Sequence, residues 1–111
     1  MRISGAQATA ALAALTKTLP PPRQAALRTL RDPGDSSILD RAMVLRFVAP
    51  ASATGEDVVE LHLHGGPAVV AAVLRVLGTL PWLRLAEPGE FTRRGFDNGR
   101  IDLSQSEGLA D

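Results

Sequence analysis

The residue that first suggests chemistry in this chain of 111 residues is Glu60. Apolar residues recur at every second position of the stretch 57–63, which predicts a β-strand with one face in the core. The core-facing residues of that strand would be Val59, Leu61 and Leu63. Glu60 then lies on the opposite face, where its carboxylate can accept two hydrogen bonds from neighbouring N–H groups, such as those of a pterin's aminopyrimidinone edge. The alternative is a solvated strand carboxylate, because exposed glutamates are common.

Two histidines share that face of the predicted strand. His62 and His64 stand two positions apart, a spacing that can bind zinc, but a third ligand would have to come from an Asp or Glu that nothing places nearby. Structural or solvent-facing histidines are therefore favoured over a metal site. His64 also opens the sequence His-Gly-Gly-Pro, a strand-to-helix turn whose helix N-terminus could favour an anion. A tight turn without a ligand is the simpler interpretation, and the chain contains no GxxxxGKS/T phosphate loop.

Three arginines, Arg93, Arg94 and Arg100, lie on or just after a short helix predicted over 90–97. Their guanidinium groups could grip a carboxylate or a phosphate, although a solvated face is the default interpretation of such a cluster. By the same logic Arg2, near the start of the chain, would be disordered. No Ser/His/Asp set and no acid/base pair stands at a defined spacing, so the residues alone predict a ligand face and no catalytic centre.

The composition is that of one globular domain, with 45% hydrophobic and 22% charged residues. Twelve basic and twelve acidic residues leave no net charge, so a contact with RNA would need a local basic patch. The absence of cysteine excludes disulfides and thiolate chemistry within the chain. No apolar run approaches the length of a membrane span, and the first residues lack the order of a signal peptide, so we expect a cytoplasmic protein with no membrane partner.

The first element predicted along the chain is a helix. Ser4 and Gln7 have capping-box spacing ahead of an apolar helical pattern, which the prolines at 20–22 stop. Residues 1–3 are interpreted as too short for a strand. A domain normally supplies more chain before such a cap, so we expect that the start of this domain is missing.

The remaining elements complete an α+β layout. Two stretches, 25–31 and 38–48, flank turn-forming residues and predict a β-hairpin. Residues 68–77 carry one charge and predict a largely buried helix that stops at Gly78. Trp82 to Leu85 is interpreted as a short strand, and a capping-box spacing opens a further helix at Leu103. We therefore predict an antiparallel or mixed sheet with helices packed on one face.

Four segments together resemble one family, the tRNA-modification GTPases called MnmE or TrmE. They are RISG at 2–5, TGEDVVELHLHGGP at 54–67, PGEFTRRGFDNGR at 88–100 and DLSQSEGLAD at 102–111. Their order and spacing are those of the family's amino-terminal domain. The resemblance implies that 1–111 is a single folate-binding and dimer-forming domain, incomplete at its start, with 102–111 beginning the family's helical domain. It also implies a fold similar to the tetrahydrofolate-binding part of the glycine-cleavage T-protein.

The resemblance carries the family's folate contacts onto Arg2, Glu60 and Arg100. The expected cofactor is 5-formyl- or methylene-tetrahydrofolate, bound near the interface of a homodimer. Arg100 stands where many relatives have lysine, which keeps the charge but replaces a point donor with a planar fork. The family's additional first strand and Gly-rich loop are missing before RISG, and this puts the geometry of the pocket in question.

For the longer protein the resemblance implies GTP hydrolysis dependent on potassium and magnesium in a separate GTPase domain. It also implies a heterotetramer with the flavoprotein MnmG, also called GidA, that modifies the wobble uridine of tRNAs to the carboxymethylaminomethyl type. This chain lacks the GTPase domain, so we expect it not to be catalytic alone. Two alternatives remain open: an aminomethyltransferase-like domain that transfers the one-carbon unit itself, and a fragment that only dimerises.

Overall fold

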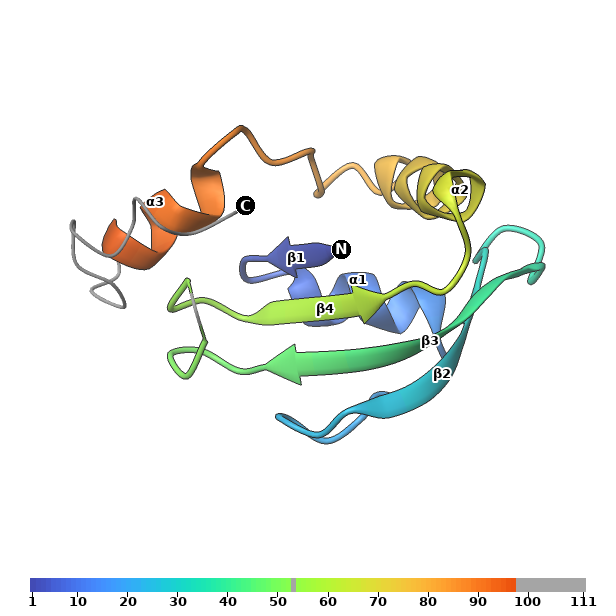
Figure 1. Cartoon of the computed structure of the whole chain (residues 1–111), viewed down its shortest axis with the longest axis horizontal. Helices are drawn as coiled ribbons and strands as arrows, with labels where there is room; N and C mark the ends of the chain where they lie inside the picture. Colours follow the sequence, from blue (N-terminus) through green and yellow to red (C-terminus); the bar gives the residue numbers. More distant parts are fainter. Residues whose placement is uncertain (53, 98–111) are drawn as a thin grey trace.

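The computed structural model describes residues 1–52 and 54–97, which form a four-stranded sheet and three helices (Figure 1). The strands lie in the order β1-β4-β3-β2, and each neighbouring pair is antiparallel. Their bounds are β1 Arg2–Ser4, β2 Ala26–Arg31, β3 Ile38–Phe47 and β4 Val58–His62. The helices are α1 Ala8–Leu15, α2 Pro67–Gly78 and α3 Glu90–Asp97. The predicted α+β class is confirmed, with an antiparallel sheet.

The start of the chain forms an edge strand, so the interpretation of residues 1–3 as too short for one is wrong. β1 pairs with β4, and the amino group of Met1 donates to the carbonyl oxygen of Leu61 at 3.0 Å. Ile3 fills a place in the core with 8% of its surface exposed. Because β4 is itself buried and fixed, three residues suffice to extend the sheet by one strand.

Ser4 belongs to this strand and does not cap α1, which corrects the capping-box prediction. Its hydroxyl lies 2.8 Å from Oγ1 of Thr54, while Gln7 occupies the N-cap position without a side-chain hydrogen bond. Gly5 turns the chain from β1 toward α1 with a φ of 123°, a conformation that glycine adopts far more easily than other residues. α1 buries one face against the sheet, made by Ala8, Ala11, Leu12 and Leu15.

The hairpin of β2 and β3 is confirmed. Its turn begins with Asp32, whose Oδ1 accepts a hydrogen bond from the N–H of Gly34 at 2.8 Å, a local bond typical of Asp in turns. The register shifts between Leu30 and Arg31, which marks a bulge next to the turn. The bulge lies far from the β4 side of the sheet, so it leaves the Glu60 face regular.

α2 is buried on one side only, and the prediction of a largely buried helix is wrong. Val73, Val76 and Leu77 pack into the core, whereas Val70 and Leu74 remain 37% and 39% exposed. The reason is that α2 has the sheet on one side only, and none of the other described elements covers its outer side. Composition alone does not reveal this, because both sides of the helix carry aliphatic residues.

The segment after α2 contains no strand at Trp82 to Leu85, where one was predicted; it is a turn followed by irregular chain that leads to α3. α3 itself has the predicted bounds. The helix predicted from Leu103 lies outside the described residues.

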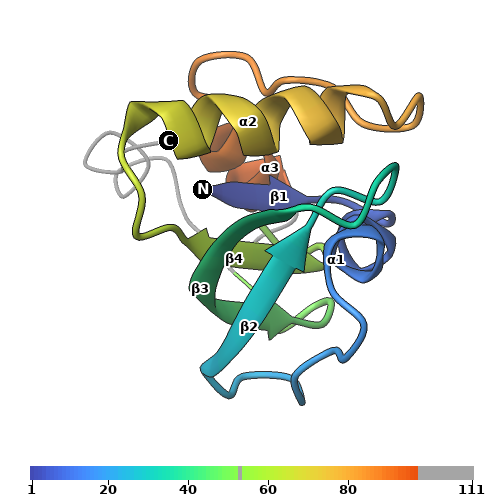
Figure 2. The same ribbon diagram turned by 90° about the vertical axis from the view of Figure 1, so that its right-hand side faces the viewer.

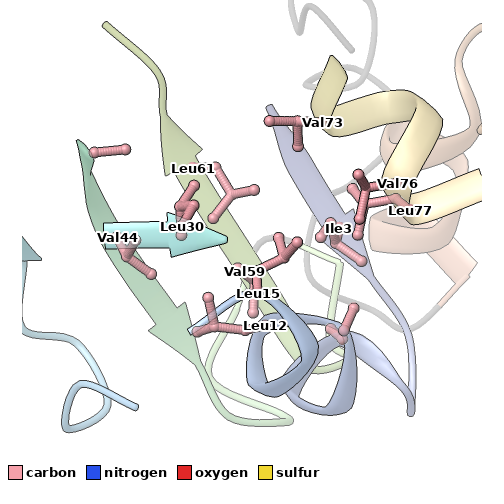
Figure 3. Packing of buried hydrophobic residues seen from close by; sticks show 13 residues of the cluster. Ile3, Leu12, Leu15, Leu30, Val44, Val59, Leu61, Val73, Val76 and Leu77 are labelled. Carbon is pink, nitrogen blue, oxygen red and sulfur yellow. The ribbon is translucent and has the colours of Figure 1, made fainter. Parts of the chain in front are cut away.

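One hydrophobic core joins α1 and α2 to the same face of the sheet (Figures 2 and 3). Figure 2 shows α1 beside the sheet and α2 above β1. The sheet contributes Ile3, Leu30, Ala42, Val44, Val59 and Leu61 to that core. All of these side chains lie on one face, so Glu60 and its cross-strand neighbours lie on the other. Within the described residues, no helix is long and apolar enough to span a membrane.

Candidate functional site

Glu60 lies on the face of β4 that points away from the core, as the alternation predicts. Its strand neighbours Val59 and Leu61 are fully buried, whereas the Glu60 side chain keeps 30% of its surface exposed. Its Oε1 lies 3.1 Å from Nε2 of His62, two positions along the same face. The carboxylate therefore stands at the surface of the sheet, where a ligand can reach it.

β1 places Arg2 beside Glu60. The two residues are opposite each other in the antiparallel pairing of β1 with β4, and opposite residues share one face of a sheet. The guanidinium carbon of Arg2 lies 5.4 Å from the ring centroid of Phe91 on α3, a cation–π arrangement. The expectation of a disordered Arg2 is therefore wrong. Pairing with a strand distant in the sequence holds this residue, and no local pattern indicates such pairing.

Arg94 is held by carboxylates and does not belong to a freely solvated face. Its Nη1 donates to Oε1 of Glu56 at 3.1 Å, and its Nη2 donates to Oε2 of Glu90 at 2.7 Å. Glu90 also accepts two hydrogen bonds from Arg84, at 2.8 and 2.5 Å. These bonds, with that of Arg84 foremost, lower the pKa of the Glu90 carboxyl to about 2. The resulting chain of ion pairs attaches α3 to the loop before β4 and to the segment before α3.

The other two arginines of the cluster are placed differently. Arg93 is exposed, which agrees with the solvated interpretation. Arg100 lies outside the described residues, so its place beside Arg2 and Glu60 stays a prediction.

A hollow of about 400 Å³ lies along β1, between α2, the segment 79–89 and α3. Its wall combines apolar side chains with charged ones, including Leu74, Leu77, Trp82, Phe91, Arg2, Glu56 and Arg94. Glu60 does not line the hollow, but its neighbour Arg2 does. A ligand on the Glu60 face therefore has Arg2 at the boundary between the sheet surface and the hollow.

Each of the two histidine rings makes one local contact. His62 contacts Glu60, and Nδ1 of His64 lies 2.7 Å from the carbonyl oxygen of Arg41. In the described part of the chain, no group of three His, Cys, Asp or Glu residues is arranged to hold a metal ion.

The turn after β4 is anchored by Asp40. Its Oδ2 accepts hydrogen bonds from the N–H groups of His64 at 2.8 Å and Gly65 at 3.5 Å. Burial raises the pKa of Asp40, but these N–H groups and that of Arg41 outweigh it, so the pKa lies below its ordinary value. The carboxylate of Asp40 therefore holds the backbone of the turn in place.

Sequence reasoning missed three residues that shape the site: Asp40, Glu56 and Phe91. Each acts on a residue more than twenty positions away, on another element. A signal was present for Glu56 and Phe91, since both lie inside the segments that carry the family resemblance. Their contacts, however, follow only from where the fold places α3.

Comparison with known proteins gives a consistent result over the whole chain. A family model described as "GTP-binding protein TrmE N-terminus" matches residues 1–100. A tRNA modification GTPase MnmE from Novosphingobium aromaticivorans is 63% identical over 111 residues, which cover 100% of this chain and 25% of that protein. One from Parvibaculum lavamentivorans is 60% identical over 112 positions, covering 100% of this chain and 26% of that protein.

The similarity extends to a eukaryotic protein. A mitochondrial 5-taurinomethyluridine tRNA synthase subunit from Danio rerio is 53% identical over 111 residues, which cover 100% of this chain and 22% of that protein. The chain thus spans about a quarter of the length of these relatives. With the family model matching most of its residues, the chain belongs to the TrmE family and corresponds to its amino-terminal region.

Proposed function

We propose that this chain binds a one-carbon tetrahydrofolate, 5-formyl or methylene, on the sheet face around Glu60. The observation that carries the proposal is the placement of Arg2 directly opposite Glu60 on that face. The carboxylate of Glu60 supplies two acceptor oxygens there, and the guanidinium group of Arg2 supplies N–H donors beside it. A pterin ring offers the complementary pattern, with two neighbouring N–H donors and a carbonyl acceptor on one edge.

In this arrangement Glu60 anchors the aminopyrimidinone edge of the pterin. Arg2 donates to the ring carbonyl or to the glutamate part of the folate. Arg100 is the third proposed contact, in agreement with the family resemblance. Glu60 and Arg2 are suited to hydrogen-bond the pterin ring, and on this ground we favour binding over catalysis in this domain.

Titration of 5-formyltetrahydrofolate into the protein and into Glu60→Ala tests the proposal. Loss of a charge-assisted acceptor leaves the ligand's N–H groups without a partner, so we expect affinity to fall about tenfold or more. Glu87→Ala is the matched control, because Glu87 is an exposed glutamate outside the wall of the hollow and the Glu60 face. Equal affinities for the protein and Glu60→Ala would remove Glu60 from the site, and an equal loss in Glu87→Ala would show a nonspecific effect of charge.

We further propose the assembly that the relatives' names and the family resemblance support. Two copies of this domain form a homodimer in the cytoplasm, and residues 102–111 lead into a helical domain. The longer protein hydrolyses GTP with potassium and magnesium in its GTPase domain. It acts with the flavoprotein MnmG (GidA) on the wobble uridine of tRNA. Sedimentation of the protein as a monomer at all concentrations would contradict the dimer.

A further inference from the structure

β1 and α3 contact each other at two points. Arg2 lies over the ring of Phe91. Two residues further along β1, the main-chain carbonyl oxygen of Ser4 accepts a hydrogen bond from Nη1 of Arg94 at 3.5 Å. Positions 91 and 94 are one helical turn apart, and such residues lie on the same side of a helix. α3 therefore reaches β1 with the side chains of Phe91 and Arg94, and the ion pairs of Arg94 hold it there.

The ring of Phe91 restricts the guanidinium group of Arg2. An arginine side chain on an edge strand has many rotamers, and fixing it on binding costs entropy that subtracts from affinity. A ring 5.4 Å away offers one favoured position, at the boundary between the Glu60 face and the hollow. The guanidinium group of Arg2 is thus held in position before a ligand arrives.

We propose that Phe91 is a positioning residue, which orients Arg2 for the ligand on Glu60 without contacting the pterin edge itself. The inference rests on the proposed folate site and adds a residue of α3 to it. A cation–π contact at a partly exposed site has a modest effect, so Phe91→Leu is expected to weaken the binding of 5-formyltetrahydrofolate about two- to fivefold. Phe91→Tyr, which keeps the ring, is expected to bind as tightly as the parent protein.

The decisive experiment is a double-mutant cycle with Arg2→Ala. If Phe91 acts through Arg2, Phe91→Leu weakens binding in the parent protein and has no further effect in Arg2→Ala. If Phe91 has only a packing role, the loss is the same in both backgrounds, and this result would overturn the inference. Urea unfolding of every variant ensures that only folded proteins are compared, and Phe91→Met replaces the leucine variant if the latter does not fold.

The two proposals fail in different ways. Should Arg2→Ala and Glu60→Ala both bind folate like the parent protein, the folate site itself is wrong. Should both lose affinity while Phe91→Leu does not, the folate site stands and the positioning role is refuted.

Discussion

Replacing Gly65 with alanine tests how tightly the turn between β4 and α2 is packed. A Cβ added to Gly65 would lie 2.6 Å from Cβ of Val69 and still closer to one of its Cγ atoms, whereas a Cβ on Gly66 would meet nothing within 4 Å. The two glycines are adjacent in one turn and receive the same methyl group. Gly66→Ala is therefore a matched control for Gly65→Ala.

The size of the stability loss in Gly65→Ala depends on which neighbouring atoms can move away from the new Cβ. A rotation of the Val69 side chain removes the Cγ contacts only, and valine in a helix has one strongly preferred rotamer. The contact with its Cβ can be relieved only by a shift of the backbone, in the turn or in the first turn of α2. Overpacking of this kind costs about 1–3 kcal/mol. Gly66 has φ −76° and ψ −159°, which alanine can adopt, so Gly66→Ala should change stability by less than about 1 kcal/mol.

Urea unfolding of the two variants, followed by circular dichroism, measures the difference. We expect a lower midpoint for Gly65→Ala at an unchanged slope, and a midpoint close to that of the parent protein for Gly66→Ala. Adding Val69→Ala should recover part of the loss in Gly65→Ala, because it removes the Cγ atoms but keeps Cβ. Equal midpoints for the two alanine variants, or a loss that Val69→Ala does not reduce, would refute the packing argument.

Two further outcomes follow from the core and from the ion pairs of α3. Leu61→Ala should lower the free energy of unfolding by about 2–5 kcal/mol in the same assay, since Leu61 is 0% exposed and its removal leaves a cavity; a smaller loss would mean that the core collapses around the site. Glu90 should stabilise the fold fully above its ordinary pKa of 4.5, and this contribution should disappear as the pH falls toward the folded value of about 2. The difference in stability between the protein and Glu90→Gln should therefore shrink over that range of pH, and a constant difference would contradict the role of Arg84.

The regular elements and the face of Glu60 could be predicted because they depend on periodicity within short stretches. Alternation every two residues places Val59 and Leu61 in the core and Glu60 opposite them, whatever else the chain does. The hairpin and α3 follow in the same way from local turn and helix signals. The capping-box prediction at Ser4 failed because a strand partner and Thr54 compete for the same residue, and neither is local.

Family membership was likewise contained in the order of short motifs along the chain. What only the tertiary structure decided is which distant residues meet: Arg2 with Glu60 and Phe91, and Arg94 with Glu56. These contacts depend on β1 adding to the edge of the sheet and on α3 reaching β1 and the loop before β4 with its side chains. Both are outcomes of packing between segments far apart in the sequence, and the periodicity of any single segment contains no information about them.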